Sequence, residues 1–127
     1  MFIWRKSRGL GERNKRKIGG QYEDLAAAYL REQGYEILER NYRDRLGEID
    51  VIAREAGYLV FVEVKYRKDQ RSGYPEEAVF ARKQQKIRHT ASYYLYRHGY
   101  GEETPCRFDV VSIAGDEEEI LLIKDAF

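Results

Sequence analysis

Residues 47–67, GEIDVIAREAGYLVFVEVKYR, decide the fold because they predict two β-strands joined by a tight turn. Residues that favour strands fill both halves, and Ala56-Gly57 supplies a short loop between them. The second half, from Tyr58 to Arg67, is almost continuous in strand-forming residues, which is typical of a central strand covered on both faces. The stretch therefore predicts a β-hairpin in the middle of a sheet.

The register of this hairpin brings charged side chains together. If the two residues that flank the loop pair with each other, Asp50 lies opposite Glu63 and Glu48 lies opposite Lys65. Directly opposed side chains have Cβ atoms about 4.5–5.5 Å apart, and positions two apart on one strand share a face. The hairpin therefore predicts a cluster of three carboxylates and one ammonium group on a single face of the sheet.

Such a cluster is costly unless something binds to it, because neighbouring carboxylates repel and burial increases the repulsion. Mg²⁺ would relieve it, since this ion prefers hard oxygen ligands and commonly takes one or two protein carboxylates plus phosphate. Mn²⁺ is a possible substitute. Lys65 could orient a water molecule or stabilise charge on a reacting phosphate. The alternative is a structural ion pair of Lys65 with Glu63 or Glu48, but these charges interrupt the most apolar strand of the chain. We therefore predict a metal site with catalytic residues Asp50, Glu63 and Lys65, with Glu48 as a further ligand.

Helices and strands are predicted on both sides of the hairpin. In chain order they are a helix at about 20–33, a strand at 35–43, a helix at 75–97, and strands at 107–114 and 119–124. The resulting order is helix, three strands, helix, two strands. It predicts a single domain over residues 18–127, an α/β sandwich with a mixed central sheet.

The two helices offer further polar side chains to the site. Glu23 shares a helical stripe with alanines and a leucine, so its carboxylate is expected to point towards apolar packing. Gln84 lies on an apolar stripe of the second helix, and Lys83 sits beside it. Each of these residues is either part of the metal site or a polar residue at the rim of the core.

Charge along the chain favours a polyanionic partner, although the net charge is only +1. Residues 1–17 carry seven basic side chains and one acidic one, and we expect them to form a flexible basic arm. Residues 65–97 carry nine basic and three acidic side chains. Two basic blocks around an acidic centre could bind a nucleic-acid backbone; the alternative is an ordinary solvated surface.

The sequence does not predict a membrane protein. The longest clearly apolar stretch falls far short of the roughly 20 residues that a spanning helix needs. A single cysteine, Cys106, cannot form an internal disulfide, which fits a reducing compartment. We therefore expect a cytoplasmic protein without a membrane partner.

Asp50, followed after a short hairpin by Glu63-Val64-Lys65, resembles the D…ExK signature of the PD-(D/E)xK nuclease superfamily. Further motifs over about residues 15–127 are similar to those of the bacterial YraN-like family. They are Gln21-Tyr22-Glu23 through Tyr29-Leu30, Arg40-Asn41-Tyr42-Arg43, Gly47-Glu48-Ile49-Asp50, the run from Phe61 to Arg67, Glu77-Ala78-Val79, Lys83-Gln84, and Arg107-Phe108-Asp109-Val110-Val111.

The resemblance implies a restriction-endonuclease-like fold similar to that of archaeal Holliday-junction resolvases. It also implies that Glu23 joins Asp50 and Glu63 around the metal, that Lys65 assists the water, and that the protein is a possible homodimer. Ile49 stands where the superfamily signature has proline. Many members lack that proline.

Three functions stay open at this point. The first is a Mg²⁺-dependent endonuclease on DNA, which is preferred to RNA, including branched or damaged DNA. The second is a nucleic-acid-binding module that keeps the nuclease fold without significant activity. The third is a protein-interaction factor that uses the basic arm and the acidic C-terminal region. The complete set of Asp50, Glu63 and Lys65 favours the first.

Overall fold

The computed structural model of the chain describes residues 2–5, 18–67, 81–115 and 119–127. Its elements are β1 (Phe2–Arg5), α2 (Ile18–Glu32), β2 (Glu36–Asp44), β3 (Gly47–Glu55), β4 (Tyr58–Arg67), α3 (Ala81–Arg97), β5 (Cys106–Ala114) and β6 (Glu119–Ile123). The predicted order of helices and strands from α2 onward is confirmed. The expected start of the second helix at residues 75–80 lies outside the described residues.

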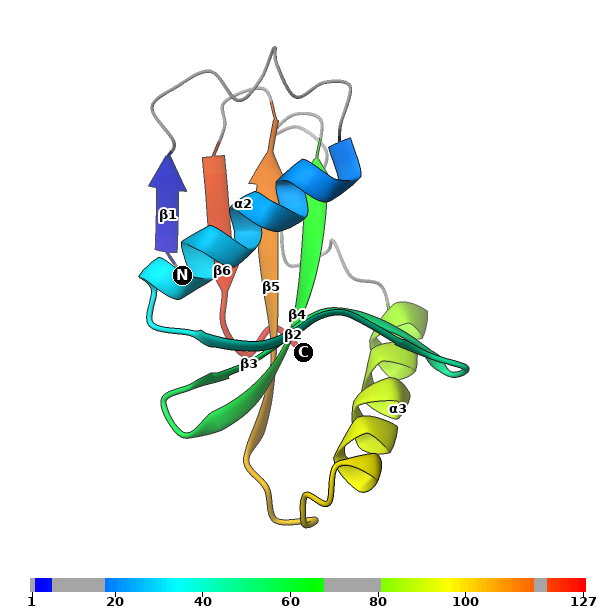
Figure 1. The fold of residues 1–127 in the computed structure, drawn as a ribbon. Helices are drawn as coiled ribbons and strands as arrows, with labels where there is room; N and C mark the ends of the chain where they lie inside the picture. The colour runs from blue at the N-terminus through cyan, green and yellow to red at the C-terminus, as the bar shows by residue number, and fades with distance from the viewer. Residues whose placement is uncertain (1, 6–17, 68–80, 116–118) are drawn as a thin grey trace.

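All six strands form one sheet in the order β1-β6-β5-β4-β3-β2 (Figure 1). Strands β4 and β5 are parallel, and every other neighbouring pair is antiparallel. A parallel pair needs a long crossover connection, and the segment that carries α3 supplies it. The protein is therefore a mixed α/β fold, as predicted, and it is consistent with a restriction-endonuclease-like sandwich.

Strand β1 differs from the flexible arm that was expected for residues 1–17. Phe2–Arg5 pair antiparallel with Glu119–Leu122 of β6 at the edge of the sheet. The sequence Phe-Ile-Trp is rich in strand-forming residues, and β6 offers a backbone edge for it to join. The remainder of the expected arm, residues 6–17, lies outside the described residues.

The two helices cover opposite faces of the sheet, and each seals its own apolar core. In Figure 1, α2 crosses in front of β6, β5 and β4, while α3 lies at the lower right beneath the turn between β2 and β3. Val60 and Val62 of β4 pack in the α2 core, whereas Leu59 and Phe61 pack in the α3 core. Strand β4 is therefore covered on both faces, as its continuous run of strand formers predicted.

None of the described helices is both long enough and apolar enough to cross a membrane.

The hairpin of β3 and β4 has the predicted register, but its ladder of paired residues is short. Glu55 pairs with Tyr58, and the pairing continues as far as Val51 with Val62. Beyond that point β3 leaves β4 and stays paired with β2 alone. Val51 packs in the α2 core while Ile49 packs in the α3 core, although residues two apart in a regular strand share a face. The strand therefore bends at the residue between them, which is Asp50.

Candidate metal site between β3 and β4

Asp50 lies at the bend. Its side chain accepts a hydrogen bond that a backbone carbonyl would accept in a regular pair of strands. The backbone N–H of Val64 in β4 donates a hydrogen bond of 2.8 Å to Asp50 Oδ2. A carboxylate thus satisfies a strand amide next to the last backbone pair, Val51 with Val62. This contact fixes the orientation of the Asp50 carboxyl and leaves its other oxygen for a further partner.

The charges of two other carboxyl groups act on Asp50, and we call Asp50, Glu63 and Glu23 the acidic group. The pKa of Asp50 is raised to about 7, first by burial and next by the negative charge of Glu63. The charge of Glu23 on α2 adds to the increase, whereas the Val64 amide and the Lys83 ammonium oppose it. Strand β4 supplies Glu63, the bend in β3 supplies Asp50, and α2 supplies Glu23.

Glu63 is buried, with 7% of its surface exposed, and it is paired with a helix residue. Lys83 of α3 places its Nζ 2.7 Å from Glu63 Oε1. Burial acts against the Lys83 ammonium, but its hydrogen bond to Glu63 and the charges of Glu63, Asp50 and Glu48 prevail and raise its pKa. Lys83 therefore neutralises part of the negative charge of the acidic group from the α3 side.

Lys65 and Gln84 lie at the edges of this cluster. Lys65 is half-buried and, by the alternation of the strand, is on the same face of β4 as Glu63. Within the described parts of the chain, the structure assigns the Lys65 side chain no hydrogen bond or ion pair. Gln84 is half-buried beside Lys83, on the stripe of α3 that continues into the buried Ile87.

Glu48 is not paired with Lys65, which the register of the hairpin predicted to lie opposite it. Its side chain is exposed and forms an ion pair of 2.8 Å with Arg43, its partner across β2 and β3. The reason is the bend: β3 has left β4 before it reaches Glu48, so the pairing with Lys65 that would follow from a straight hairpin is not part of the ladder. Glu48 therefore belongs to the rim of the site.

The donor set fits a hard divalent cation that keeps part of its coordination for water and phosphate. Among the described residues there is no group of three or more His, Cys, Asp or Glu side chains already close enough to enclose a metal ion. Mg²⁺ commonly binds through one or two carboxylates with waters and substrate phosphate as its other ligands. Asp50 and Glu63, with Glu23 nearby, match that requirement better than they match a closed structural site.

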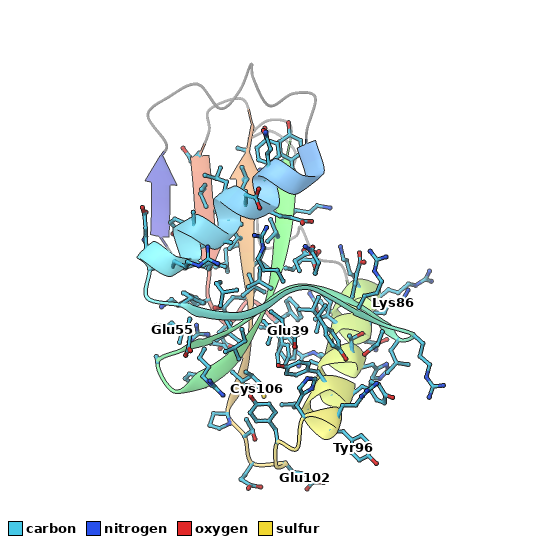
Figure 2. All side chains as sticks on the ribbon, in the orientation of Figure 1. Glu39, Glu55, Lys86, Tyr96, Glu102 and Cys106 are labelled. Atoms are coloured by element: carbon cyan, nitrogen blue, oxygen red, sulfur yellow. The ribbon has the colours of Figure 1, made fainter. Side chains whose placement is uncertain are left out.

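A cavity of about 680 Å³ lies beside the acidic group, and we call it the cationic groove. Its residues come from the β2–β3 turn and the start of α3: Arg43, Asp44, Arg45, Leu46, Gly47, Glu48, Arg82, Lys83, Lys86 and Ile87. Figure 2 shows Lys86 on α3, on the other side of the molecule from Glu55. The contribution of the β2–β3 turn was not predicted, because hydrophobic periodicity does not reveal which turn packs against which helix.

Residues 22–113 match the family described as "Uncharacterised protein family UPF0102". A UPF0102 protein of Lachnoclostridium phytofermentans is 60% identical, over 90% of this chain and 95% of its own length. A relative from Symbiobacterium thermophilum is 49% identical over 88% of this chain and 97% of its own length. Another, from Colwellia psychrerythraea, is 38% identical over 99% of this chain and all of its own length. The matched region includes every residue of the acidic group.

Proposed function

The chain belongs to the UPF0102 family, and we propose that it is a metal-dependent nuclease that hydrolyses phosphodiester bonds in DNA. One observation carries the proposal: Asp50 and Glu63 are held together in a largely buried position that raises the pKa of Asp50 to about 7. Two facing carboxylates destabilise a fold unless a cation or proton relieves them. A strongly perturbed carboxyl with a specific charged neighbour is typical of a functional site.

In this proposal each side chain has a role that follows from its position. Asp50 and Glu63 would hold the cation, with Glu23 at the edge of the same site. A bound divalent cation would neutralise charge on the phosphate and lower the pKa of an attacking water. The Val64 amide keeps the Asp50 carboxyl in place. Lys65 would donate a hydrogen bond to the water or the phosphate from the same face of β4.

A second candidate function is a nucleic-acid-binding module with the nuclease fold and no significant activity. The ion pair between Lys83 and Glu63 supports it, because an ammonium group already neutralises one of the two principal carboxylates. The difference between the candidates is whether a divalent cation displaces Lys83 from Glu63.

The test is cleavage of a panel of linear, flapped and four-way DNA and structured RNA, with Mg²⁺ or Mn²⁺ and with EDTA as control. We expect the wild type to cut DNA. Asp50→Asn and Glu63→Gln should lose at least about a hundredfold in rate, because each removes a charged ligand. Lys65→Gln should lose rate but retain cation binding in calorimetry. Glu102→Gln, a change in an exposed acid outside the site, is the matched control.

Two results together would rule out the enzyme. They are a full panel left uncut under both metals, and calorimetry without cation binding that depends on Asp50. The binding module would then be the better description.

A further inference from the structure

The cationic groove has two walls that are fixed against each other. The β2–β3 turn forms one wall and the first turns of α3 form the other. They meet at Gly47, where a Cβ atom would lie 2.8 Å from Thr90 Oγ1, so this close approach requires glycine. Thr90 is fully buried, and its hydroxyl donates to the backbone carbonyl of Lys86.

The turn is also held by its own hydrogen bonds. Asp44 Oδ1 accepts the backbone N–H groups of Leu46 at 2.8 Å and Gly47 at 3.3 Å. The Tyr42 hydroxyl donates to Asp44 Oδ2 at 2.8 Å. The groove is therefore a preformed feature, whose wall does not need to be ordered by a ligand.

The two acidic side chains of the groove already have hydrogen-bond or ion-pair partners within the protein. Asp44 closes the turn, and Glu48 pairs with Arg43. Arg45, Arg82 and Lys86 are exposed, and within the described residues no hydrogen bond or ion pair is assigned to their cationic groups. The groove therefore presents three positive charges for which the described protein supplies no counter-charge.

Lys83 connects the groove with the acidic group. Lys83 lines the groove and at the same time lies 2.7 Å from Glu63. A chain of anionic groups that passes through the groove would thus reach the carboxylates within one side-chain length. A single free anion would not need an extended row of cations on two elements.

We propose that the cationic groove binds the phosphate backbone of a nucleic acid beside the position that is cut, with Arg45, Arg82 and Lys86 contacting backbone phosphates. The identification of the ligand as nucleic acid rests on the proposed function. In this proposal the nucleic-acid strand runs from the carboxylates into the groove, between the β2–β3 turn and the start of α3. Contacts of this kind position the substrate and contribute affinity without reading its sequence.

The experiment measures DNA binding without cleavage. A fluorescent DNA duplex is titrated with the whole protein in EDTA, at several salt concentrations between about 50 and 200 mM. The test variant carries Arg45→Gln, Arg82→Gln and Lys86→Gln together. Each lost phosphate contact should lower the slope of log affinity against log salt by about 0.9, so the slope should fall by about 2 to 3. Affinity at 0.1 M salt should fall roughly tenfold to a few hundredfold.

The matched control carries Arg31→Gln, Arg54→Gln and Arg97→Gln. It loses the same net charge from exposed positions outside the groove. Its salt slope should change by less than about one unit. Far-ultraviolet circular dichroism and a thermal melt check that both variants are folded, and Lys86→Gln alone should reproduce about a third of the loss in slope. Equal slopes in the groove and control variants would overturn the proposal.

The two proposals can fail separately. If the wild type binds the duplex through the groove but cuts no substrate, the nuclease function fails and the groove stands. If the wild type cuts DNA while the groove variant binds and cuts as the wild type does, the groove proposal fails and the nuclease stands.

Discussion

Asp50 makes the stability of the cation-free protein depend on pH. Its carboxyl has a pKa of about 7 in the fold against 3.8 ordinarily, so the folded state keeps a proton that the unfolded chain releases above about pH 4. Stability from this group is therefore present at low pH and is lost as the pH rises towards 7. Asp50→Asn removes the free-energy penalty of ionising this carboxyl in the folded state. In EDTA at pH 8 the variant should therefore be more stable than the wild type by roughly 1–4 kcal/mol. At pH 4 the two should be nearly equal.

Urea denaturation at several pH values checks this difference. Glu32→Gln, which alters an exposed acid of α2, is the control and should not show the same gain at pH 8. If Asp50→Asn is no more stable than the wild type at pH 8, the carboxyl is not under the electrostatic stress described.

Lys83 competes with a divalent cation for Glu63. The ammonium lies 2.7 Å from the carboxylate, so a cation that binds there must displace it or accept its repulsion. Lys83→Gln should therefore bind Mn²⁺ several times more tightly than the wild type in calorimetry. Lys86→Gln, three residues along the helix in the same groove, should change the affinity less. Weaker Mn²⁺ binding by Lys83→Gln would mean that the lysine supports the cation site.

At the scale of single residues, the sequence predicted that Asp50 and Glu63 belong to the two strands of one hairpin, but it did not predict how these side chains are held. The ladder of β3 and β4 keeps the predicted register only as far as Val51 with Val62, and Asp50 and Glu63 lie just beyond this last pair. The hydrogen bond from the Val64 amide and the ion pair to Lys83 depend on the bend in β3 and on the rotation of α3. Neither of these is encoded in local periodicity.

The contact of the β2–β3 turn with α3 should depend on the absence of a side chain at residue 47. Gly47→Ala would place a methyl group 2.8 Å from Thr90 Oγ1, and we expect a loss of about 1–3 kcal/mol in the free energy of unfolding. Thr90→Ala removes the clashing oxygen, so the double variant should lose less than the two single losses together. Denaturant unfolding of the four proteins completes the cycle, and strict additivity would contradict the close contact.

At the scale of elements, the helices and strands could be predicted, whereas the residue at which the pairing of β3 with β4 ends could not. The apolar run of β4 and the loop at Ala56-Gly57 define the hairpin by local signals. The departure of β3 from β4 after Val51 is instead a compromise between two cores, because Ile49 is drawn to the α3 side. Strand β1 was missed for a similar reason, since its partner β6 lies at the opposite end of the chain.

The end of the molecule that carries the loop between β3 and β4 holds a buried ionic network centred on Asp109 and Arg107 of β5. Asp109 has no exposed surface, and it accepts hydrogen bonds from Arg107 at 2.8 and 2.9 Å and from the Tyr35 hydroxyl at 2.6 Å. Arg107 also pairs with Glu55 at 2.7 Å, and the backbone N–H of Asp125 completes the set on Asp109. Tyr35 precedes β2, Glu55 ends β3, Arg107 is on β5 with Asp109, and Asp125 follows β6. The network therefore joins four segments that are far apart in the sequence.

Arg107→Met should therefore destabilise the whole protein. It leaves Asp109 buried without its counter-charge, for which a loss of about 3–5 kcal/mol in the free energy of unfolding is expected. Tyr35→Phe removes a neutral hydroxyl that donates to Asp109 and accepts from Arg107, and it should lose about 1–3 kcal/mol. Urea denaturation measures both. Because neither residue touches the acidic group, the Mn²⁺ affinity of the folded fraction should be unchanged, and a change in it would show that the two ends are coupled.

At the scale of the molecule, the sequence predicted the fold class but not the assembly of this network. The alternation of helices and strands follows from composition and turns, and it implies an α/β sandwich. The convergence of Tyr35 and Arg107 on Asp109, with Glu55 paired to Arg107, depends on the packing of β5 in the sheet, where β5 is parallel to β4. That register is set by three-dimensional packing across a long crossover.

The hydrogen bond between Val64 and Asp50 makes one backbone amide a spectroscopic reporter. An amide proton that is donated to a charged carboxylate resonates further downfield than one donated to the neutral acid, because the stronger acceptor withdraws more electron density from the hydrogen. The Val64 amide lies in the middle of the sheet, in a strand covered on both faces. In a nitrogen–proton correlation spectrum, its peak should therefore move with the protonation of Asp50 and again when a cation arrives, and the acidic group could be followed without any label placed on it.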